Sequence, residues 1–416
     1  MHPKIVPGDT AWLLFSAALM MIMTPALGFF YGGLVRRKNV LSTIMHSFLI
    51  LCLISVQWVL WGYSLAFGPD VRGWGIIGDL SWAGLNGVGL APNPAYGATV
   101  PQLAFVAFQM MFAVITPALI TGAFAERKRF KAFVIFTLLW ATFVYDPLTH
   151  WVWGHGGWLS RLGTLDFAGG TVVEIASGIS ALVAAIVLGR RIEFQRGEGY
   201  PEDPYNAAMT MLGAGLLWFG WFGFNAGSAI VSGGLAANAF VVTNTAGAMA
   251  ALTWMTVSWM HRGTPSVVGA TIGAIAGLVA ITPAAGYVTM PASVLIGMGA
   301  GIACYLCVHF MKRSGVDDVL DVFAIHGIGG LWGTLATGIF ATLAINPGAA
   351  NGLLYGNPRQ LLIQAFAAAV AFVYCGLMTF VILKVVNAFV PLRVSEQEEV
   401  MGLDATQHRE VVAGAP

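Results

Sequence analysis

One carboxylate and one imidazole stand inside otherwise apolar or small-residue stretches of this sequence. Glu174 lies in DFAGGTVVEIASG (166–178), and His326 lies in DDVLDVFAIHGIGG (317–330). A carboxyl and an imidazole in contact can share a proton, and each can present a polar edge to a small molecule. The same pair can also be a buried hydrogen bond that only ties two helices together. The residues alone leave both interpretations open.

Each of these two residues follows an aspartate by eight positions. Asp166 precedes Glu174, and Asp318 precedes His326. Asp166 stands where it can cap the free amides at the start of a helix and complement the helix dipole, which favours a structural role. A carboxylate at an outer mouth would also attract a cation. The shared spacing gives weak support for an internal repeat, since a single coincidence of this kind arises easily by chance.

Aromatic residues gather in two motifs, FVAFQMMF and WFGWFGFNAGS. Phe108 and Phe112 are four residues apart, and Trp221, Phe224 and Ser228 are spaced by three and four, so each set shares one helix face. Most aromatic stripes in membrane helices pack against neighbours or mark the interface. A face that combines Trp, Phe and a hydroxyl also suits a small cation, through cation–π attraction and one hydrogen-bond acceptor.

The composition places these residues in a membrane. The 416-residue chain is 57% hydrophobic and 9% charged, with mean hydropathy +0.77, whereas soluble domains carry about 25% charged residues. Apolar runs of about 20 residues recur along the whole length, each long enough to cross a bilayer as a helix. The runs are continuous and do not alternate as barrel strands do. We predict an all-α polytopic membrane protein, and the net charge of +1 gives no indication of nucleic-acid binding.

Hydropathy, with Gly, Pro and charge as punctuation, predicts eleven transmembrane helices. The expected spans are 11–35, 41–67, 101–125, 132–153, 168–189, 206–230, 236–260, 266–284, 289–311, 324–345 and 359–389. Of the 20 Lys and Arg, all but Lys4, Arg72, Arg161 and Arg359 fall on one side, which leaves 16. The positive-inside rule therefore places the N-terminus outside and the C-terminus in the cytoplasm.

The eleven spans divide into five, five and one. Two five-helix halves of opposite orientation, about 11–190 and 206–345, are the architecture that puts a binding site at the midplane. Glu174 and His326 would then come from equivalent helices and meet near the pseudo-symmetry axis. With the last helix at about 359–389, we expect a transmembrane domain at 1–390 and a cytoplasmic tail at 391–416.

The four cysteines all lie inside apolar runs. Cys304-x-x-Cys307 has a spacing found in redox and metal sites, but no second Cys/His pair accompanies it. We interpret these two as small side chains in a packed helix, and we expect no disulfide and no metal.

Five blocks of the chain resemble the family of ammonium transporters, methylammonium permeases and Rhesus proteins. They are GFFYGGLVRRKNVLS, FQMMFAVITPALITGAFAER, DFAGGTVVEI, WFGFNAGSA and DDVLDVFAIHGIGG. The resemblance covers nearly the whole chain, including the tail, and the short tail and compact loops suit a prokaryotic member. It implies a multi-pass transporter of ammonium or ammonia in the cell membrane, with no cofactor.

The resemblance also assigns roles near the outer face. Trp153, Phe108 and Ser228 resemble a recruitment site that holds ammonium by cation–π interaction and hydrogen bonding. Phe112 and Phe224 resemble a stacked gate that closes the pore below that site.

Deeper in the pore the chain departs from the family pattern. Asp166 resembles a structural acid behind the outer site, and His326 matches the second histidine of the family's pore pair. Glu174 stands where most members have the first histidine, as in a subset that includes some fungal permeases. A carboxyl keeps the capacity to accept and donate a proton, so the resemblance implies that a proton relay is retained.

Three other functions were weighed against ammonium transport with proton co-transfer. A passive ammonia channel of the Rhesus type would have an outer site less adapted to cations. An ammonium sensor of this family usually carries an appended signalling domain. An intramembrane enzyme would need a nucleophile or a metal cluster, and HExxH is absent, so no enzymatic activity is expected. The resemblance further implies a homotrimer and, on the cytoplasmic face, a P-II signalling protein as partner.

Overall fold

The computed structural model describes residues 4–195 and 204–411. Within them, ten helices are long and apolar enough to cross a membrane: Pro7–Leu34, Arg37–Phe67, Gln102–Phe124, Phe130–Leu162, Gly170–Leu188, Ala207–Gly227, Gly234–Arg262, Met290–Ser314, Phe323–Phe340 and Pro358–Phe389. An eleventh, shorter apolar helix is Val267–Ile281. Each of the eleven overlaps one predicted span, which confirms the all-α, eleven-helix prediction. The described residues contain isolated β-bridges but no strand.

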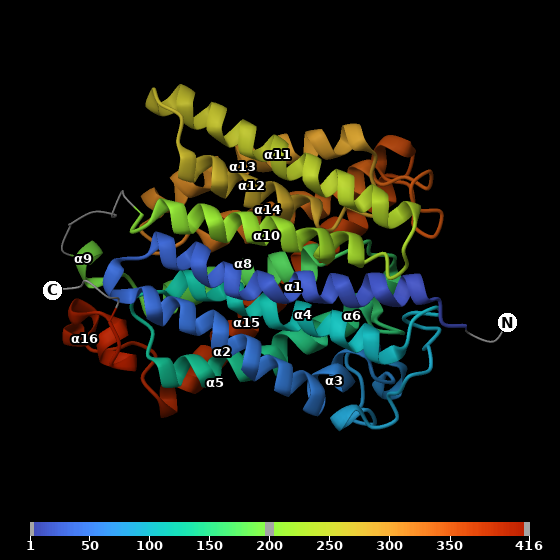
Figure 1. Ribbon diagram of the computed structural model, residues 1–416, viewed down its shortest axis with the longest axis horizontal. Helices are drawn as coiled ribbons and strands as arrows, with labels where there is room; N and C mark the ends of the chain where they lie inside the picture. Colours follow the sequence, from blue (N-terminus) through green and yellow to red (C-terminus); the bar gives the residue numbers. More distant parts are fainter. Residues whose placement is uncertain (1–3, 196–203, 412–416) are drawn as a thin grey trace.

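The transmembrane units are built from α-helices that short π-helical segments interrupt. In the labels of Figure 1 the α-helices are α1 (Pro7–Leu34), α2 (Val40–Gln57), α3 (Tyr63–Phe67), α4 (Gln102–Ile120), α5 (Phe130–Trp140), α6 (Asp146–Trp153), α7 (Trp158–Leu162), α8 (Ala176–Leu188), α9 (Ile192–Gln195), α10 (Ala207–Gly227), α11 (Gly234–Arg262), α12 (Val267–Ile281), α13 (Met290–Ser314), α14 (Ile328–Phe340), α15 (Pro358–Phe389) and α16 (Glu396–Met401). The π-helical segments are η2 (Trp58–Gly62), η6 (Ala141–Tyr145), η7 (Gly170–Ile175), η8 (Phe323–Gly327) and, in the tail, η10 (Asp404–His408).

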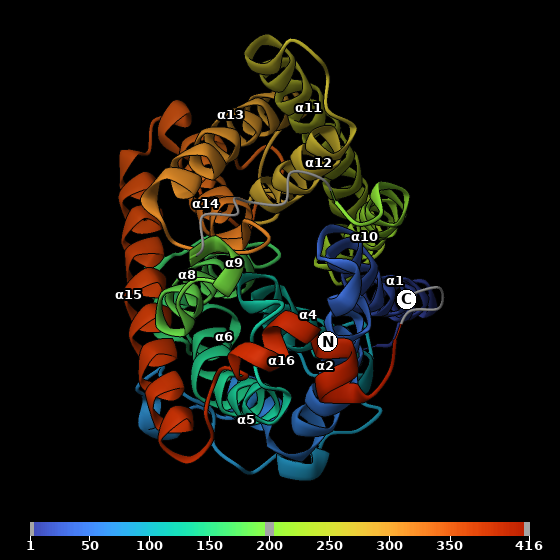
Figure 2. The ribbon, with the colours of Figure 1, turned by 90° about the vertical axis from the view of Figure 1, so that its left-hand side faces the viewer.

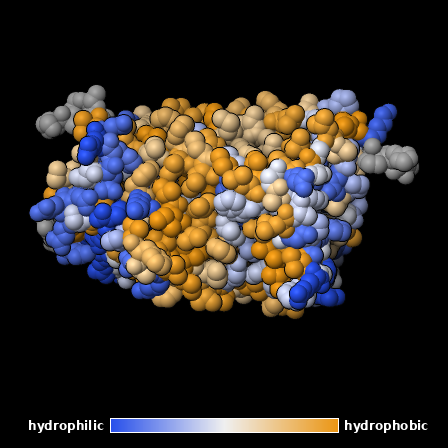
Figure 3. Space-filling model, turned by 90° about the horizontal axis from the view of Figure 1, so that it is seen from below, coloured by the Kyte–Doolittle hydropathy of each residue, from blue (hydrophilic) through white to orange (hydrophobic). Residues whose placement is uncertain are grey.

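The helices form one bundle, and the N-terminus and the C-terminus of the chain lie at opposite ends of it (Figure 1). An odd number of crossings requires this arrangement. An apolar belt lies between two polar ends of the surface (Figure 3). At the end that carries the C-terminus, α11 and α13 finish with basic last turns, followed by Gly263 and Gly315 in left-handed conformations. Basic residues at helix C-termini complement the dipole, and their position agrees with a cytoplasmic C-terminus.

Helices α1 and α10 lie side by side along the bundle (Figures 1 and 2). Glycines of α10 permit this close approach. A Cβ at Gly213 would lie 2.4 Å from the backbone nitrogen of Phe30, and one at Gly223 would lie 2.6 Å from the carbonyl oxygen of Ser16. Small residues let membrane helices pack backbone against backbone. This contact joins the first and sixth spans, which begin the two predicted halves.

The cytoplasmic connections are tied together by a buried ion network. Glu126 contacts Arg36 at 2.6 Å and Arg191 at 2.7 Å, and Arg191 in turn contacts Asp317 at 2.9 Å. Burial alone would raise the pKa of Glu126, but the two guanidinium groups lower it well below its ordinary value of 4.5. The network links connections from both halves of the chain.

The tail packs against the cytoplasmic ends of the helices. Asp404 accepts hydrogen bonds from the backbone amides of Leu41 and Ser42 at 3.0 and 2.7 Å, and Glu399 accepts one from Ile192 at 2.8 Å. Figure 2 shows α16 at this end of the bundle, over α2 and α5. Residues 412–416 of the predicted tail lie outside the described residues.

Candidate functional site

Glu174 and His326 meet in the middle of the bundle. His326 Nδ1 lies 2.6 Å from Glu174 Oε2; Glu174 is 1% exposed and His326 is 4% exposed. The second carboxylate oxygen, Oε1, has no hydrogen-bond partner in the described structure. A donor or acceptor is therefore left available at the point where the two side chains meet.

Each member of this pair lies inside a π-helical segment, Glu174 in η7 and His326 in η8. Such segments insert an extra residue into a turn and occur frequently at functional sites. The two helices touch through glycine, because a Cβ at Gly178 would lie 2.1 Å from the backbone nitrogen of Gly327. Any larger residue at Gly178 would push η8 away and separate the pair.

An aspartate caps each of the two segments. Asp166 accepts hydrogen bonds from the amides of Gly169, Gly170 and Thr171 at 2.7, 2.7 and 2.8 Å. Asp318 accepts one from the amide of Phe323 at 2.7 Å. The equal eight-residue spacing thus corresponds to equivalent capping at the starts of η7 and η8, which agrees with a carboxylate at a helix N-terminus.

Glu174 and His326 border a narrow hollow that is almost entirely apolar. Its volume is about 10 Å³, about the least that holds a single water. The other lining residues are Met23, Leu27, Phe30, Ile115, Leu119, Val173, Leu217, Trp221, Phe224 and Ile275. A hollow of this size and polarity has room for one small molecule and offers few polar partners to replace the hydration of an ion.

The two phenylalanines of the predicted gate lie against each other, and one of them, Phe224, lines the narrow hollow. The rings of Phe112 and Phe224 lie 4.4 Å apart at their centroids, with an angle of 49° between their planes, so they are tilted and not parallel. Trp153 contacts Phe112 edge to face at 5.3 Å, and Phe108 does so at 5.2 Å.

Outside the two rings lies a second hollow of about 370 Å³, which holds part of the predicted recruitment site. Trp153, Ser228 and Asp166 line it. Trp153 Nε1 donates to the backbone oxygen of Asp166 at 2.8 Å, and Ser228 Oγ donates to that of Phe224 at 2.8 Å. Because the hydroxyl hydrogen is engaged, the Ser228 oxygen offers lone pairs to a cation.

Of the predicted recruitment residues, Phe108 does not line this hollow, and its neighbour Gln109, which was not predicted, does. Phe108 is fully buried, against Phe112 and Gly227. Its neighbour Gln109 lines the hollow, and the Oε1 atom of Gln109 has no partner in the described structure. A polar amide in an apolar span was the available signal for Gln109, and the sequence analysis did not use it.

The described residues form a bundle of eleven apolar helices with a narrow apolar hollow between them. This is the architecture of a polytopic membrane channel or transporter. The chain matches the Ammonium Transporter Family over residues 11–413 and belongs to that family.

Relatives and solved structures agree with this assignment. The chain is 52% identical to an ammonium transporter of Bacillus subtilis over 404 residues, which cover 97% of this chain and 98% of that one. Its fold is similar to the crystal structure of Saccharomyces cerevisiae Mep2, with a TM-score of 0.88, 35% identity, and coverage of 95% and 89%. It is also similar to a structure described as a sensor Amt protein, with a TM-score of 0.87, 29% identity, and coverage of 96% and 98%. The chain is therefore a multi-pass ammonium transporter of the cell membrane.

Proposed function

We propose that this transporter binds ammonium in the outer hollow, removes a proton, and conducts ammonia through the apolar passage while Glu174 and His326 carry the proton. The observation that supports this most strongly is the 2.6 Å contact between the two side chains at the wall of the dehydrated hollow. The unpartnered carboxylate oxygen gives the pair a position at which a proton can be accepted.

The physical problem is to admit ammonium and reject potassium, which has similar size and charge. An apolar passage rejects both ions, because neither recovers its hydration energy inside. Ammonium can release a proton and become neutral, whereas potassium cannot. Deprotonation before entry therefore provides selectivity that ion size alone does not supply.

The outer residues have distinct parts in this proposal. Trp153 supplies a ring face for the cation and Ser228 an oxygen acceptor. Phe112 and Phe224 form the gate, and the buried Phe108 supports the Phe112 ring. Asp166 is the structural acid: its carboxylate holds the start of η7 and so fixes Glu174.

We further propose that the chain consists of two inverted five-helix halves, one final helix and the tail at 391–416. The pairing of α1 with α10, and of η7 with η8, joins equivalent elements of the two halves. A homotrimer and a P-II partner at the cytoplasmic face are proposals from the family resemblance. A pull-down with purified P-II protein, with and without ADP or 2-oxoglutarate, tests the second, and absence of binding in every condition removes it.

Two alternatives remain distinct from this function. A passive gas channel of the Rhesus type would move ammonia without charge, and a sensor would report ammonium without needing high flux. Solid-supported-membrane electrophysiology separates them: an ammonium pulse on reconstituted protein should give a transient current. A pH change inside the vesicles without current would support the gas channel. The absence of both the current and the pH change would support a sensor. Catalysis is not part of the proposal, since the chain belongs to a transporter family.

The outer site can be tested separately from the relay. Ser228→Ala removes one acceptor, worth about 1 kcal/mol, and should raise the ammonium concentration for half-maximal current by about fivefold with little change in the maximum. Thr245→Ala is the matched control, because Thr245 is a partly exposed hydroxyl residue on α11 that also donates to its own helix and does not line either hollow. Equal effects of both substitutions would argue against the recruitment role.

A further inference from the structure

A large cavity opens at the cytoplasmic end of the molecule, next to the inner end of the passage. Its volume is about 700 Å³, within the usual range of ligand sites. Ile272 lines this cavity, and Ile275, one turn further along α12, lines the narrow hollow. On α1, Leu34 likewise lines the cavity, and Phe30, one turn away, lines the narrow hollow. A molecule in the cavity would therefore lie on the route out of the passage.

The cavity exists because α12 is shorter than its neighbours. It has 15 residues, against 29 in α11 and 25 in α13, and the cavity is lined by residues from the start of α12 and from the ends of the two longer helices. Val267, Val268 and Gly269, at the start of α12, form part of the cavity wall. Ser266 Oγ accepts the amide of Gly269 at 2.9 Å.

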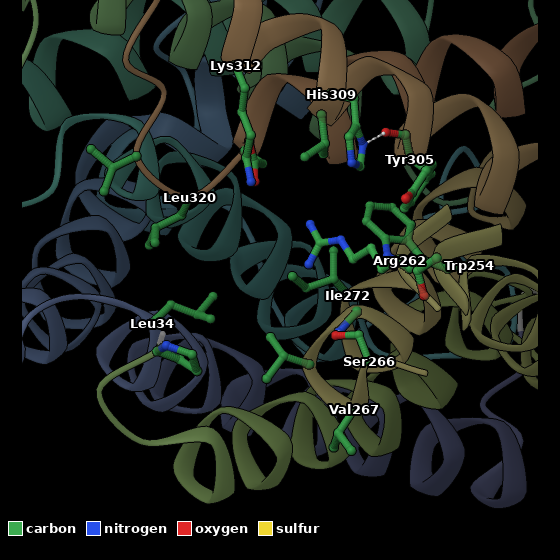
Figure 4. Close-up of a pocket in the computed structure, with 17 residues that line it drawn as sticks. Leu34, Trp254, Arg262, Ser266, Val267, Ile272, Tyr305, His309, Lys312 and Leu320 are labelled. Atoms are coloured by element: carbon green, nitrogen blue, oxygen red, sulfur yellow. Dashed lines mark hydrogen bonds between the residues drawn. The ribbon is translucent and has the colours of Figure 1, made fainter. Parts of the chain in front are cut away.

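Basic side chains from the two long helices surround the cavity. Figure 4 shows Arg262, from the end of α11, and Lys312 and His309, from α13, around one open space. His309 Nδ1 donates to the backbone oxygen of Tyr305 at 2.8 Å, because a carbonyl can only accept. Nε2 is left as the second edge of the ring and can donate when the imidazole is protonated. Arg262 and Lys312 are positively charged irrespective of that proton.

One acid opposes these charges. Asp321 also lines the cavity, near Lys312. Burial and the neighbouring Asp318 raise its pKa, and Lys312 lowers it, with a result of about 7. Near neutral pH the carboxyl is therefore ionised in only part of the molecules, and the cationic groups at the cavity wall outweigh it.

We propose that this inner cavity binds a phosphate group, held by Arg262 and Lys312 with the start of α12 behind it. Guanidinium groups bind phosphate through two parallel hydrogen bonds, ammonium groups bind it as a compact charge, and a helix N-terminus favours an anion. A bound phosphate would neutralise the positive wall that ammonium meets when it forms at the inner mouth.

Two sources can supply this phosphate group. A soluble phosphate compound can enter from the cytoplasm through the cavity mouth. A phospholipid can place its headgroup there and a chain in the adjacent apolar groove of about 500 Å³ between α10, α11 and α12, which shares Ser266 and Val267 with the cavity. The chemistry of the headgroup site is the same in both cases.

Binding to the full-length purified protein in detergent tests the site, with inorganic phosphate as the probe and isothermal titration calorimetry at constant ionic strength. Saturable binding is expected, weakened at least about tenfold by Arg262→Gln combined with Lys312→Gln. Arg313→Gln is the matched control, since Arg313 is the next residue of α13 and is also exposed; its affinity should stay within about twofold of wild type. Asp321→Asn should strengthen binding, and asparagine also tolerates the positive φ of 56° at this position.

The lipid source needs a second arm. Protein reconstituted in phosphatidylcholine, with or without an equal part of phosphatidylglycerol, is extracted and its retained lipid measured by mass spectrometry. Retention of phosphatidylglycerol that is lost in the double variant, without binding of inorganic phosphate, assigns the site to a lipid headgroup. Binding of inorganic phosphate that the double variant loses assigns it to a soluble compound. If the double variant, shown to be folded by its unchanged melting temperature, behaves like wild type in both arms, or if wild type binds neither probe, the proposal is wrong.

Discussion

Among the residues that the structure describes, two contacts join a carboxylate to an imidazole, and their surroundings differ. Glu174 and His326 meet at 2.6 Å, come from the two halves of the chain, and border the narrow hollow. Asp70 and His150 meet at 3.0 Å near the outer end, where a connecting loop packs on α6. The functional groups, a carboxylate and an imidazole, are the same in both contacts, so chemistry alone does not separate their roles.

The second contact is engaged in holding the loop. His150 Nδ1 contacts the backbone oxygen of Ala66 at 3.0 Å, so both ring nitrogens have partners, and Asp70 Oδ1 also accepts the amide of Gly75 at 2.7 Å. Each contact keeps one carboxylate oxygen without a partner in the described structure, Oε1 of Glu174 and Oδ2 of Asp70, so a spare oxygen does not separate them. The comparison teaches that position matters more than the pair itself: Glu174 and His326 border the narrow hollow, whereas His150 has a partner on each ring nitrogen and holds a loop.

The largest effect is expected from breaking the central pair. His326→Ala removes the partner of a buried carboxylate and the only imidazole at this wall of the hollow among the residues that line it. Ammonium-driven current should fall at least about tenfold. An unchanged size-exclusion profile of the purified variant is the control for its folding. A current within twofold of wild type would indicate that the contact between Glu174 and His326 is only structural.

A carboxylate that is only structural should affect stability and leave conduction unchanged. Glu126 is fully buried between Arg36 and Arg191, and its substitution by Gln should cost about 3 kcal/mol of unfolding free energy. Because its folded pKa is lowered, Glu126 stabilises the protein above about pH 4.5, and that contribution is lost as the pH falls below this value.

Thermal unfolding as a function of pH measures this contribution. The Glu126→Gln profile should be flatter than wild type below about pH 4.5. Glu396→Gln, at an exposed position of α16, should keep the wild-type profile. Parallel profiles for wild type and Glu126→Gln across this range would contradict the assignment.

Glu174→His replaces the carboxyl by an imidazole, so two side chains that can carry a proton still face each other at the hollow. Two imidazoles also share a proton, so transport of ammonium should persist. Because carboxyl and imidazole titrate in different ranges, the pH of half-maximal current should move by about one unit or more. Uptake of radiolabelled methylammonium across pH checks this, and an unchanged profile would count against a pore role for Glu174.

The smallest effect on transport is expected at the outer tie. Asp70→Asn keeps a hydrogen-bonding side chain beside His150 and leaves the hollow untouched. The current should stay within about twofold of wild type, while the unfolding free energy falls by about 1 kcal/mol. A loss of current as large as that in His326→Ala would remove the distinction between the two contacts.

Sequence reasoning predicted the spans because length and apolarity leave few other solutions in a bilayer. It also selected Glu174 and His326, since an ionisable residue in an apolar run is costly and therefore conspicuous. The family resemblance placed Phe108 at the outer site, whereas in the structure Phe108 is buried beside Phe112 and its neighbour Gln109 lines the outer hollow. The π-helical segments under both pore residues leave no signature in composition.

The account depends on Glu174 as a proton carrier, and paired current measurements test this most directly. Wild type, Glu174→Gln and Asp70→Asn are reconstituted at matched protein density and exposed to ammonium pulses on a solid-supported membrane. The account predicts a transient current for wild type and Asp70→Asn and none for Glu174→Gln, since the amide cannot take up a proton. A Glu174→Gln current equal to that of wild type would contradict it.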